Sequence, residues 1–485
     1  MKYLIPALLM VCLCTVTRAA SPTVTVTPDM ALRAGTLMQH ALDGNIAYEL
    51  VASLTTEVGP RLAGTEAEAR ARHWAVEKLT ALGFSNVRVE AFEVPRWERG
   101  EGRARIVAPF PQPLVVTALG GSSSTGPQGV QGEVVAFASL AALEAAPADH
   151  VKGRIVFIDE PMARSRDGSG YVKAVAKRRE VAYVAARKGA IAALIRSVGT
   201  SVHRFAHAGQ MRRVTEADES GVPASGVPAA GVPASGVPAA GVPAAALASP
   251  DANQLRRILD RGEPVILELV LTPRELPPAP SGNVIAEIPG REVPDEIVLV
   301  GAHLDSWDLG TGAVDDGAGV GIVVAAAKVL LDRLPQPPRR TIRIVLFGAE
   351  ERGLVGARAY AERHAATLGN HILATESDFG AGNIWRFDTG VPEERRDAAA
   401  ALGDVLEPLG VAPGDNEAHG GPDMKYLREA GVPVVGLLQD GRDYFDLHHT
   451  ADDTLNKIAP GDLDQNVAAY AAFLYLAAET RAYFR

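Results

Sequence analysis

From residue 283 onward, short and nearly continuous runs of apolar residues recur along the chain. They lie at 284–288, 297–300, 342–347, 372–375 and 432–438. Runs of this length with few polar positions are typical of strands that are buried on both faces. Helical patterns separate several of them, notably at 319–331. The pattern therefore predicts an α/β fold for this region.

The segments before residue 283 follow other patterns. Residues 45–54 have the spacing of an amphipathic helix. Thr65 and Glu68 form a capping box that opens a second helix, which ends near Gly83. Alternating valines and charged residues at 87–94 then predict a strand.

Between about residues 110 and 271, glycine-rich turns and short β-type runs surround one alanine-rich helix at 174–189. This change predicts a separate β-rich insert. Within it, residues 221–245 form an array of pentapeptides of the type Gly-Val-Pro-Ala-Ser. Proline at every fifth position excludes a regular helix and interrupts a strand ladder, so we expect an exposed, mobile loop. A partner-binding repeat is the alternative.

The first twenty residues have the features of a secretory signal peptide. Lys2 precedes an apolar segment at 4–16, and small residues follow at the expected cleavage site. The apolar segment is shorter than a bilayer span, so we expect cleavage, no membrane span in the mature chain, and a secreted or periplasmic protein. Both cysteines, Cys12 and Cys14, lie in this segment. The mature protein is then expected to contain neither a thiol nor a disulfide.

Length and charge narrow the class of protein further. The 485 residues suit two or three domains. A net charge of −10 argues against nucleic acid as a partner, because a basic surface supplies most of that affinity. An apolar content of 47% is that of a globular protein.

Side chains able to bind a metal follow the apolar runs. His303 and Asp305 form an H-x-D pair, in which a carboxylate can orient a metal-binding imidazole. Asp315 opens a glycine-rich turn into a helix, where its carboxylate could lie between two ions. Glu350 and Glu351 follow a buried run, so one can bind a metal while the other stays free to act as a general base.

Asp378 and His449 complete a set of two imidazoles and three carboxylates, with His303, Asp315 and Glu351. Such oxygen and nitrogen donors suit zinc. Five ligands are too many for one tetrahedral ion that keeps a position open. The set therefore predicts two zinc ions that share a carboxylate, as in metal-assisted hydrolysis.

Five motifs together resemble the zinc exopeptidases related to carboxypeptidase Q, and more distantly the secreted bacterial aminopeptidases and glutamate carboxypeptidase II. The motifs are His303-Leu304-Asp305-Ser306-Trp307-Asp308, Asp315-Asp316-Gly317, Glu350-Glu351, Glu376-Ser377-Asp378 and His448-His449-Thr450. The resemblance implies the zinc-exopeptidase fold, a mixed, mostly parallel sheet flanked by helices, with a protease-associated insert. Together with the residue patterns above, this predicts a signal peptide at 1–20, a catalytic domain made of 21–109 and 272–485, and the insert at 110–271. It also leaves a homodimer open.

The resemblance assigns roles to single residues. One zinc ion would bind His303, Asp315 and Asp378, and the other Asp315, Glu351 and His449, so that Asp315 bridges. Glu350 would be the general base and Asp305 the residue that orients His303. The bond between Asp315 and Asp316 is expected to be cis. By position, His448 would either donate a hydrogen bond to the developing oxyanion or pack behind the metal.

Two other classes of protein share part of this pattern. A second di-zinc family, represented by peptidase T and acetylornithine deacetylase, places an accessory domain between the fourth and fifth ligands, whereas here the long insert precedes His303. A binding protein of the transferrin-receptor type would lack the complete site, which this chain retains. The expected function is a secreted exopeptidase acting on short peptides or dipeptides. Aminopeptidase action on longer peptides is the alternative, and the sequence does not decide between aminopeptidase, carboxypeptidase and dipeptidase.

Overall fold

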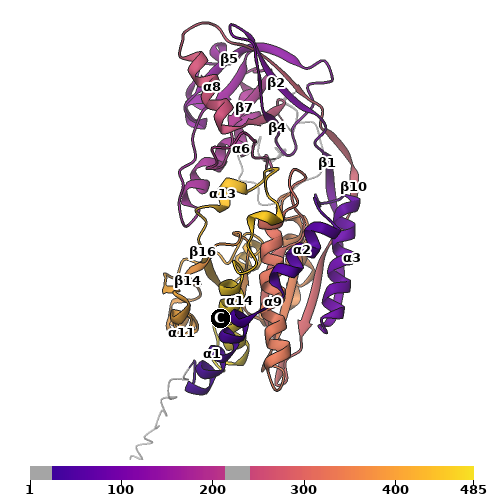
Figure 1. The fold of residues 1–485 in the computed structure, drawn as a ribbon, viewed down its shortest axis with the longest axis vertical. Coiled ribbons are helices and arrows are strands. Elements are labelled where there is room, and N and C mark those ends of the chain that lie inside the picture. Colours follow the sequence, from indigo (N-terminus) through magenta and orange to yellow (C-terminus); the bar gives the residue numbers. More distant parts are fainter. Residues whose placement is uncertain (1–24, 213–240) are drawn as a thin grey trace, which may run out of the picture.

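The computed structural model describes residues 25–212 and 241–485. It contains two sheets of eight strands each, one at either end of an elongated molecule (Figure 1). The expected signal peptide at 1–20, and residues 221–240 of the pentapeptide array, lie outside the described residues.

The first sheet is mixed and has a parallel centre. Its order is β1 (Ser85–Glu98), β10 (Arg274–Ile288), β12 (Arg340–Phe347), β11 (Val293–His303), β13 (His371–Glu376), β16 (Val434–Gln439), β14 (Ile384–Gly390) and β15 (Ala412–Pro413). The four strands β12, β11, β13 and β16 run parallel to one another. All five apolar runs of the sequence lie in strands of this sheet or overlap them, which confirms the α/β prediction.

Helices cover both faces of this sheet, and this explains why its strands are apolar at nearly every position. The helices on one face are α1 (Pro28–Asp43), α2 (Ala47–Glu57), α3 (Glu66–Ala81), α9 (Ala318–Arg333) and α14 (Asp464–Glu479). On the other face, α10 (Val355–Arg363) and α12 (Lys425–Glu429) pack on the sheet. Along β12, Ile344 and Leu346 face the first group, whereas Val345 and Phe347 face the second. Two further helices, α11 (Arg396–Asp404) and α13 (Tyr444–Leu447), follow β14 and β16 in the chain.

The N-terminal predictions agree with the structure. The Thr65 hydroxyl accepts a hydrogen bond from the Glu68 amide and so caps α3, as the capping box predicts. The strand expected at 87–94 is longer at both ends, because β1 pairs with the long strand β10 along most of its length.

The second sheet has the order β3 (Gln112–Leu114), β2 (Gly102–Ala108), β9 (Ile266–Leu271), β5 (Val130–Phe137), β6 (Ile155–Ile158), β7 (Ala192–Arg196), β8 (Ala244–Leu247) and β4 (Val116–Ala118). Helices α4 (Leu140–Ala145), α5 (Ala148–Val151), α6 (Ser169–Arg187) and α8 (Ser249–Leu259) accompany it.

The structure shifts two boundaries that the sequence predicts, the start of the insert and the end of the pentapeptide loop. The sheet begins with β2 at Gly102 rather than at residue 110, because β2 pairs with β9. Ala244 and Ala245, the end of the expected mobile loop, are instead buried in β8, which pairs with β7 on one side and β4 on the other. Their side chains pack on opposite faces of the sheet.

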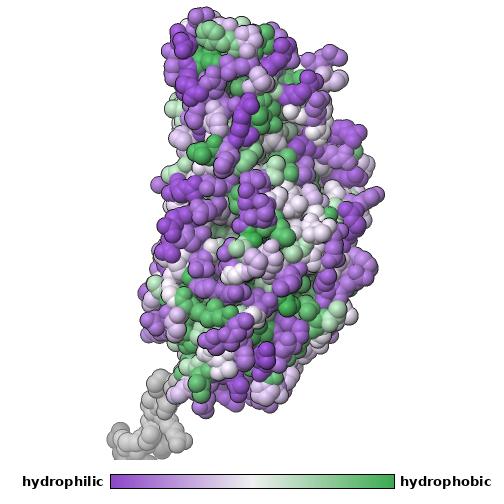
Figure 2. Space-filling model, in the orientation of Figure 1, coloured by the Kyte–Doolittle hydropathy of each residue, from purple (hydrophilic) through white to green (hydrophobic). Residues whose placement is uncertain are grey.

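Polar and apolar residues are interspersed over the face of the molecule shown in Figure 2. Among the described residues, none of the helices is both long and apolar enough to cross a bilayer.

Candidate metal centre

The predicted metal-binding residues meet at one edge of the first sheet. His303 is the last residue of β11, Glu350 and Glu351 follow β12, and Asp378 follows β13. Since these three strands are parallel neighbours, their carboxyl ends lie side by side. Asp315 comes from the turn at Ala313–Gly317 that leads into α9.

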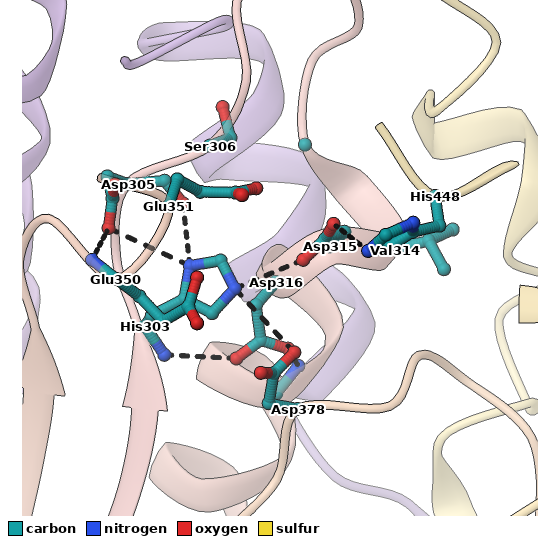
Figure 3. A network of polar contacts seen from close by, with 12 residues as sticks. His303, Asp305, Ser306, Val314, Asp315, Asp316, Glu350, Glu351, Asp378 and His448 are labelled. Carbon is teal, nitrogen blue, oxygen red and sulfur yellow. Dashed lines mark hydrogen bonds and ion pairs between the residues drawn. The ribbon is translucent and has the colours of Figure 1, made fainter. Parts of the chain in front are cut away.

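Asp315 lies between the two histidines. Its Oδ1 is 3.1 Å from Nε2 of His303, and its Oδ2 is 3.3 Å from Nε2 of His449. Asp378 Oδ1 lies 3.6 Å from the same nitrogen of His303. Glu351 Oε2 lies 3.0 Å from Nε2 of His449. Figure 3 shows the carboxylate of Asp315 reaching toward His303 on one side and His448 on the other.

The ligands expected from the sequence form two groups of donor atoms that share Asp315. The first contains His303, Asp315 and Asp378, and the second contains Asp315, Glu351 and His449. The donor atoms that lie close enough together to hold one ion are grouped somewhat differently: His303 with Asp315 and Glu351, His303 with Asp316 and Asp378, and Asp315 with His448 and His449. Glu351 Oε1 is buried and has no hydrogen-bond partner among the described residues, as expected of a ligand atom whose partner is an ion. The donors are oxygen and imidazole nitrogen, which suit zinc.

Asp316 and His448 also lie within reach of these groups. The carboxylate of Asp316 already accepts hydrogen bonds from the main-chain amides of His303 and Gly319, both at 3.0 Å. It therefore fixes β11 against the start of α9. The peptide bond between Asp315 and Asp316 is cis, as the resemblance implied.

Asp305 holds its neighbours differently from the expectation. Nδ1 of His303 lies 3.0 Å from the main-chain oxygen of Asp305, and 3.8 Å from its carboxylate Oδ1. That carboxylate instead accepts a 3.0 Å hydrogen bond from the amide of Glu350. The backbone of Asp305 thus orients the imidazole, while its side chain orients the glutamate pair.

Glu350 is partly buried beside both donor groups. Burial raises the pKa of its carboxyl well above the ordinary glutamate value, and the neighbouring Asp378 adds to this. Cations held by the adjacent donors would favour the ionised form. This carboxyl therefore has the surroundings of a group that accepts and returns a proton.

His448 packs against the second histidine. The two rings are stacked with centroids 3.5 Å apart, and Nε2 of His448 lies 3.8 Å from Asp315 Oδ2. Burial lowers the pKa of His448 to about 3, so its ring is neutral at ordinary pH. Its Nδ1 is buried without a partner among the described residues.

Two residues that support Asp315 were missed by the sequence analysis. Asp453 accepts hydrogen bonds from the amides of Val314 and Asp315 at 2.7 and 3.2 Å. The buried guanidinium of Arg61 donates to the main-chain oxygens of Leu304, Thr311 and Gly312 at 2.6–2.8 Å. In the sequence, Arg61 is marked only by its place in a Gly-Pro-Arg turn, and no hydrophobic periodicity indicates that its side chain is buried.

A cavity of about 2250 Å³ opens onto these groups. Its lining includes Glu350, Asp378 and His449, together with Tyr171 and Arg178 of α6. The second sheet and its helices therefore contribute one wall of the site.

Arg178 is a buried cation in this wall, with 5% of its surface exposed. Its Nη2 donates to the hydroxyl of Tyr171 at 2.7 Å, and its Nη1 lies 3.3 Å from Nδ1 of His449. Its Nε has no hydrogen-bond partner in the part of the chain that the structure describes. Within residues 25–212 and 241–485 it forms no ion pair with a carboxylate.

Three kinds of comparison connect the chain with known proteins. A family model described as Peptidase family M28 matches residues 283–474. Carboxypeptidase Q of Rattus norvegicus is 34% identical over 440 residues, which cover 90% of this chain and 86% of the rat protein. The human carboxypeptidase Q is 32% identical over 436 residues.

Two solved structures have the same fold. A Peptidase M28 precursor from Shewanella amazonensis is 48% identical, with a TM-score of 0.87 over 94% of this chain and 98% of that one. A zinc aminopeptidase from Bacillus subtilis has a TM-score of 0.62 at 21% identity, covering 89% of this chain and 94% of that one, and so shares the fold.

Proposed function

Because this chain belongs to peptidase family M28 and is a metallopeptidase, we propose that it is a two-zinc exopeptidase that cleaves short peptides beside a free C-terminal carboxylate. Dipeptides are the smallest such substrates. His303, Asp315 and Asp378 would hold one ion, and Asp315, Glu351 and His449 the other. The observation that carries the choice of polarity is the buried guanidinium of Arg178, which forms no ion pair with a carboxylate among the described residues.

When bound, two zinc ions would supply Lewis acidity to the scissile carbonyl and to an attacking water. The residues of the chain do the rest. Glu350 takes a proton from the water and returns it to the nitrogen of the leaving amine. Asp305 holds the main chain of Glu350 in place for both transfers.

Burial of the Arg178 guanidinium is energetically unfavourable unless an anion lies beside it. A buried charge without a counterion is strongly unfavourable, so such a group is expected to meet an anion in its working state. A guanidinium only donates hydrogen bonds. If His449 binds zinc through Nε2, its Nδ1 carries the proton and faces the carbonyl oxygen of Ala208 at 3.4 Å.

Nη1 of Arg178 cannot donate to that protonated nitrogen and is left to find another acceptor. A carboxylate at the end of a peptide matches the fork of a guanidinium in charge and shape. Since Arg178 lies beside His449, the carboxylate would be held one residue away from the scissile bond. The name of the carboxypeptidase Q relatives agrees with this polarity.

Blocking one end of a dipeptide tests the proposal. The purified protein is expected to hydrolyse a free dipeptide and to lose at least about 10-fold in kcat/KM when the C-terminus is amidated, since a hydrogen bond to a charged group contributes roughly 1.5–3 kcal/mol. Arg178→Met should lower kcat/KM for the free dipeptide by a similar factor and change the rate on the amide little. Both are measured by release of the C-terminal residue.

Arg187, which is exposed on the same helix and does not line the cavity, supplies the matched control, and Arg187→Met should leave the preference for a free carboxylate unchanged. Loss of activity on N-acetylated rather than amidated peptides would contradict the proposal. That result would favour the aminopeptidase alternative.

We also propose that His448 donates a hydrogen bond to the oxyanion that develops in the transition state. Two observations support this role: Nδ1 of His448 is buried without a partner among the described residues, and Nε2 lies 3.8 Å from Oδ2 of Asp315. His448→Ala should lower kcat by about 10²–10³-fold with little change in KM, because oxyanion contacts contribute about 2.7–4 kcal/mol. Zinc content should stay the same, as measured by elemental analysis.

His448→Phe distinguishes a donor from a packing group, since phenylalanine keeps a ring against His449. Equal losses in both variants support donation. A phenylalanine variant with normal kcat would assign His448 to packing alone.

We propose that residues 1–20 direct the protein to the periplasm or the exterior, and that the region around the second sheet is a protease-associated insert. A homodimer stays a prediction.

A further inference from the structure

The segment that follows β7 contacts the loop that carries His449. We call residues 197–211 the docking segment and residues 445–449 the ligand loop. The amide of Thr200 donates to the carbonyl of Phe445 at 3.0 Å, and the amide of Ala208 donates to the carbonyl of His449 at 2.9 Å. Between them, Nδ1 of His207 lies 2.8 Å from the carbonyl oxygen of His448.

The backbone of His449 requires support of this kind. Its φ is +62°, in the left-handed region that residues with a side chain rarely adopt. Such a conformation persists where the surroundings enforce it. The carbonyls of His448 and His449 are both held by the docking segment, which therefore fixes the direction of the His449 side chain.

His207 is placed for this one contact. It is 1% exposed, and because a carbonyl only accepts hydrogen bonds, Nδ1 must be the protonated nitrogen. Its Nε2 is buried without a partner among the described residues. Burial lowers the pKa of His207 to about 4, so the ring stays neutral.

Gly199 makes room for this ring. A Cβ atom at position 199 would lie 2.1 Å from Cε1 of His207, closer than atoms can approach. Gly199 and His207 thus form a preformed support beneath the ligand loop. The amide of His207 is itself anchored by the hydroxyl of Ser197 at 2.9 Å.

We propose that His207 is a positioning residue for His449, so that the docking segment completes the second donor group of Asp315, Glu351 and His449. The inference rests on the proposed function, because it takes His449 as a zinc ligand. The first donor group contains no residue of the ligand loop and does not depend on this contact.

Zinc affinity of the metal-stripped, full-length mature protein, measured by calorimetric titration with zinc, tests the proposal. His207→Leu is expected to weaken binding of one zinc equivalent by at least about 10-fold and to leave the other equivalent as in the wild type. His207→Asn should recover most of the loss, since its amide nitrogen stands where Nδ1 stood. His73→Leu, the same change at an exposed histidine outside the docking segment and the ligand loop, should titrate like the wild type.

His449→Ala separates the two hypotheses. If it loses one equivalent while His207→Leu titrates normally, the positioning role is wrong and the ligand assignment stands. If His449→Ala still binds two ions, the ligand assignment itself fails.

If His207 only stabilises the fold, its replacement should lower the Tm of the zinc-free protein. Thermal unfolding of the zinc-free variants measures this change. Equal weakening of both equivalents by His207→Leu, with a lower Tm and no recovery in His207→Asn, would overturn the inference.

Discussion

Glu350→Gln is expected to lower kcat at least about 100-fold while zinc content stays at the wild-type value. The amide has nearly the shape of the carboxylate but cannot take a proton from the attacking water. The main-chain amide of residue 350 would still donate its hydrogen bond to the carboxylate of Asp305, so the turn after β12 should keep its geometry. Steady-state hydrolysis of a dipeptide and elemental analysis of the same preparation provide the two measurements.

Glu351→Gln is the matched control at the neighbouring position. Its Oε2 faces His449, and its Oε1 has no partner among the described residues, so we expect this variant to lose zinc. If Glu350→Gln lost zinc and Glu351→Gln did not, the roles of the two glutamates would be exchanged.

Removal of zinc with a strong chelator is expected to abolish activity, and two zinc ions per chain should restore it. The reason is the geometry of Asp315, whose two oxygens face different histidines at 3.1 and 3.3 Å and so suit a bridge between two ions. The measurement is activity against zinc added per chain, together with metal content after desalting.

Two variants locate the ions. Asp378→Asn should weaken binding at the first donor group only, whereas Asp315→Asn should affect both, because Asp315 belongs to both groups. Full activity in a preparation that holds one tightly bound ion per chain would contradict the bridged site.

Much of the first sheet could be predicted from the sequence because burial on both faces is a local pattern. The runs in β11, β12 and β13 are apolar at almost every position, and this follows directly from helices lying on either face. The candidate ligands could be found because they come immediately after these strands. Parallel strands bring such positions together wherever the intervening helices lie.

Short and edge strands gave weaker signals. The strand β14 is antiparallel to β16, and β15 spans only Ala412–Pro413, so neither has a distinctive run. The pentapeptide pattern extends the expected loop over Ala244 and Ala245, the first half of β8, because these alanines continue the repeat in composition while their burial depends on the pairing of β8 with β7 and β4.

The sequence by itself thus determined the α/β class, the family resemblance and the set of candidate zinc ligands, since each depends on residue type and short spacing. Only the tertiary structure decided the supports and the second wall of the site. Asp453 lies 138 positions from Asp315, and His207 lies 241 positions from His448. An aspartate or a histidine so far along the chain from its partner shows no local sequence pattern. Its role depends on which main-chain amide or carbonyl the folded chain places beside it. For the same reason Arg178, on a helix of the second sheet, becomes a candidate for carboxylate recognition only once α6 is seen against the ligand loop.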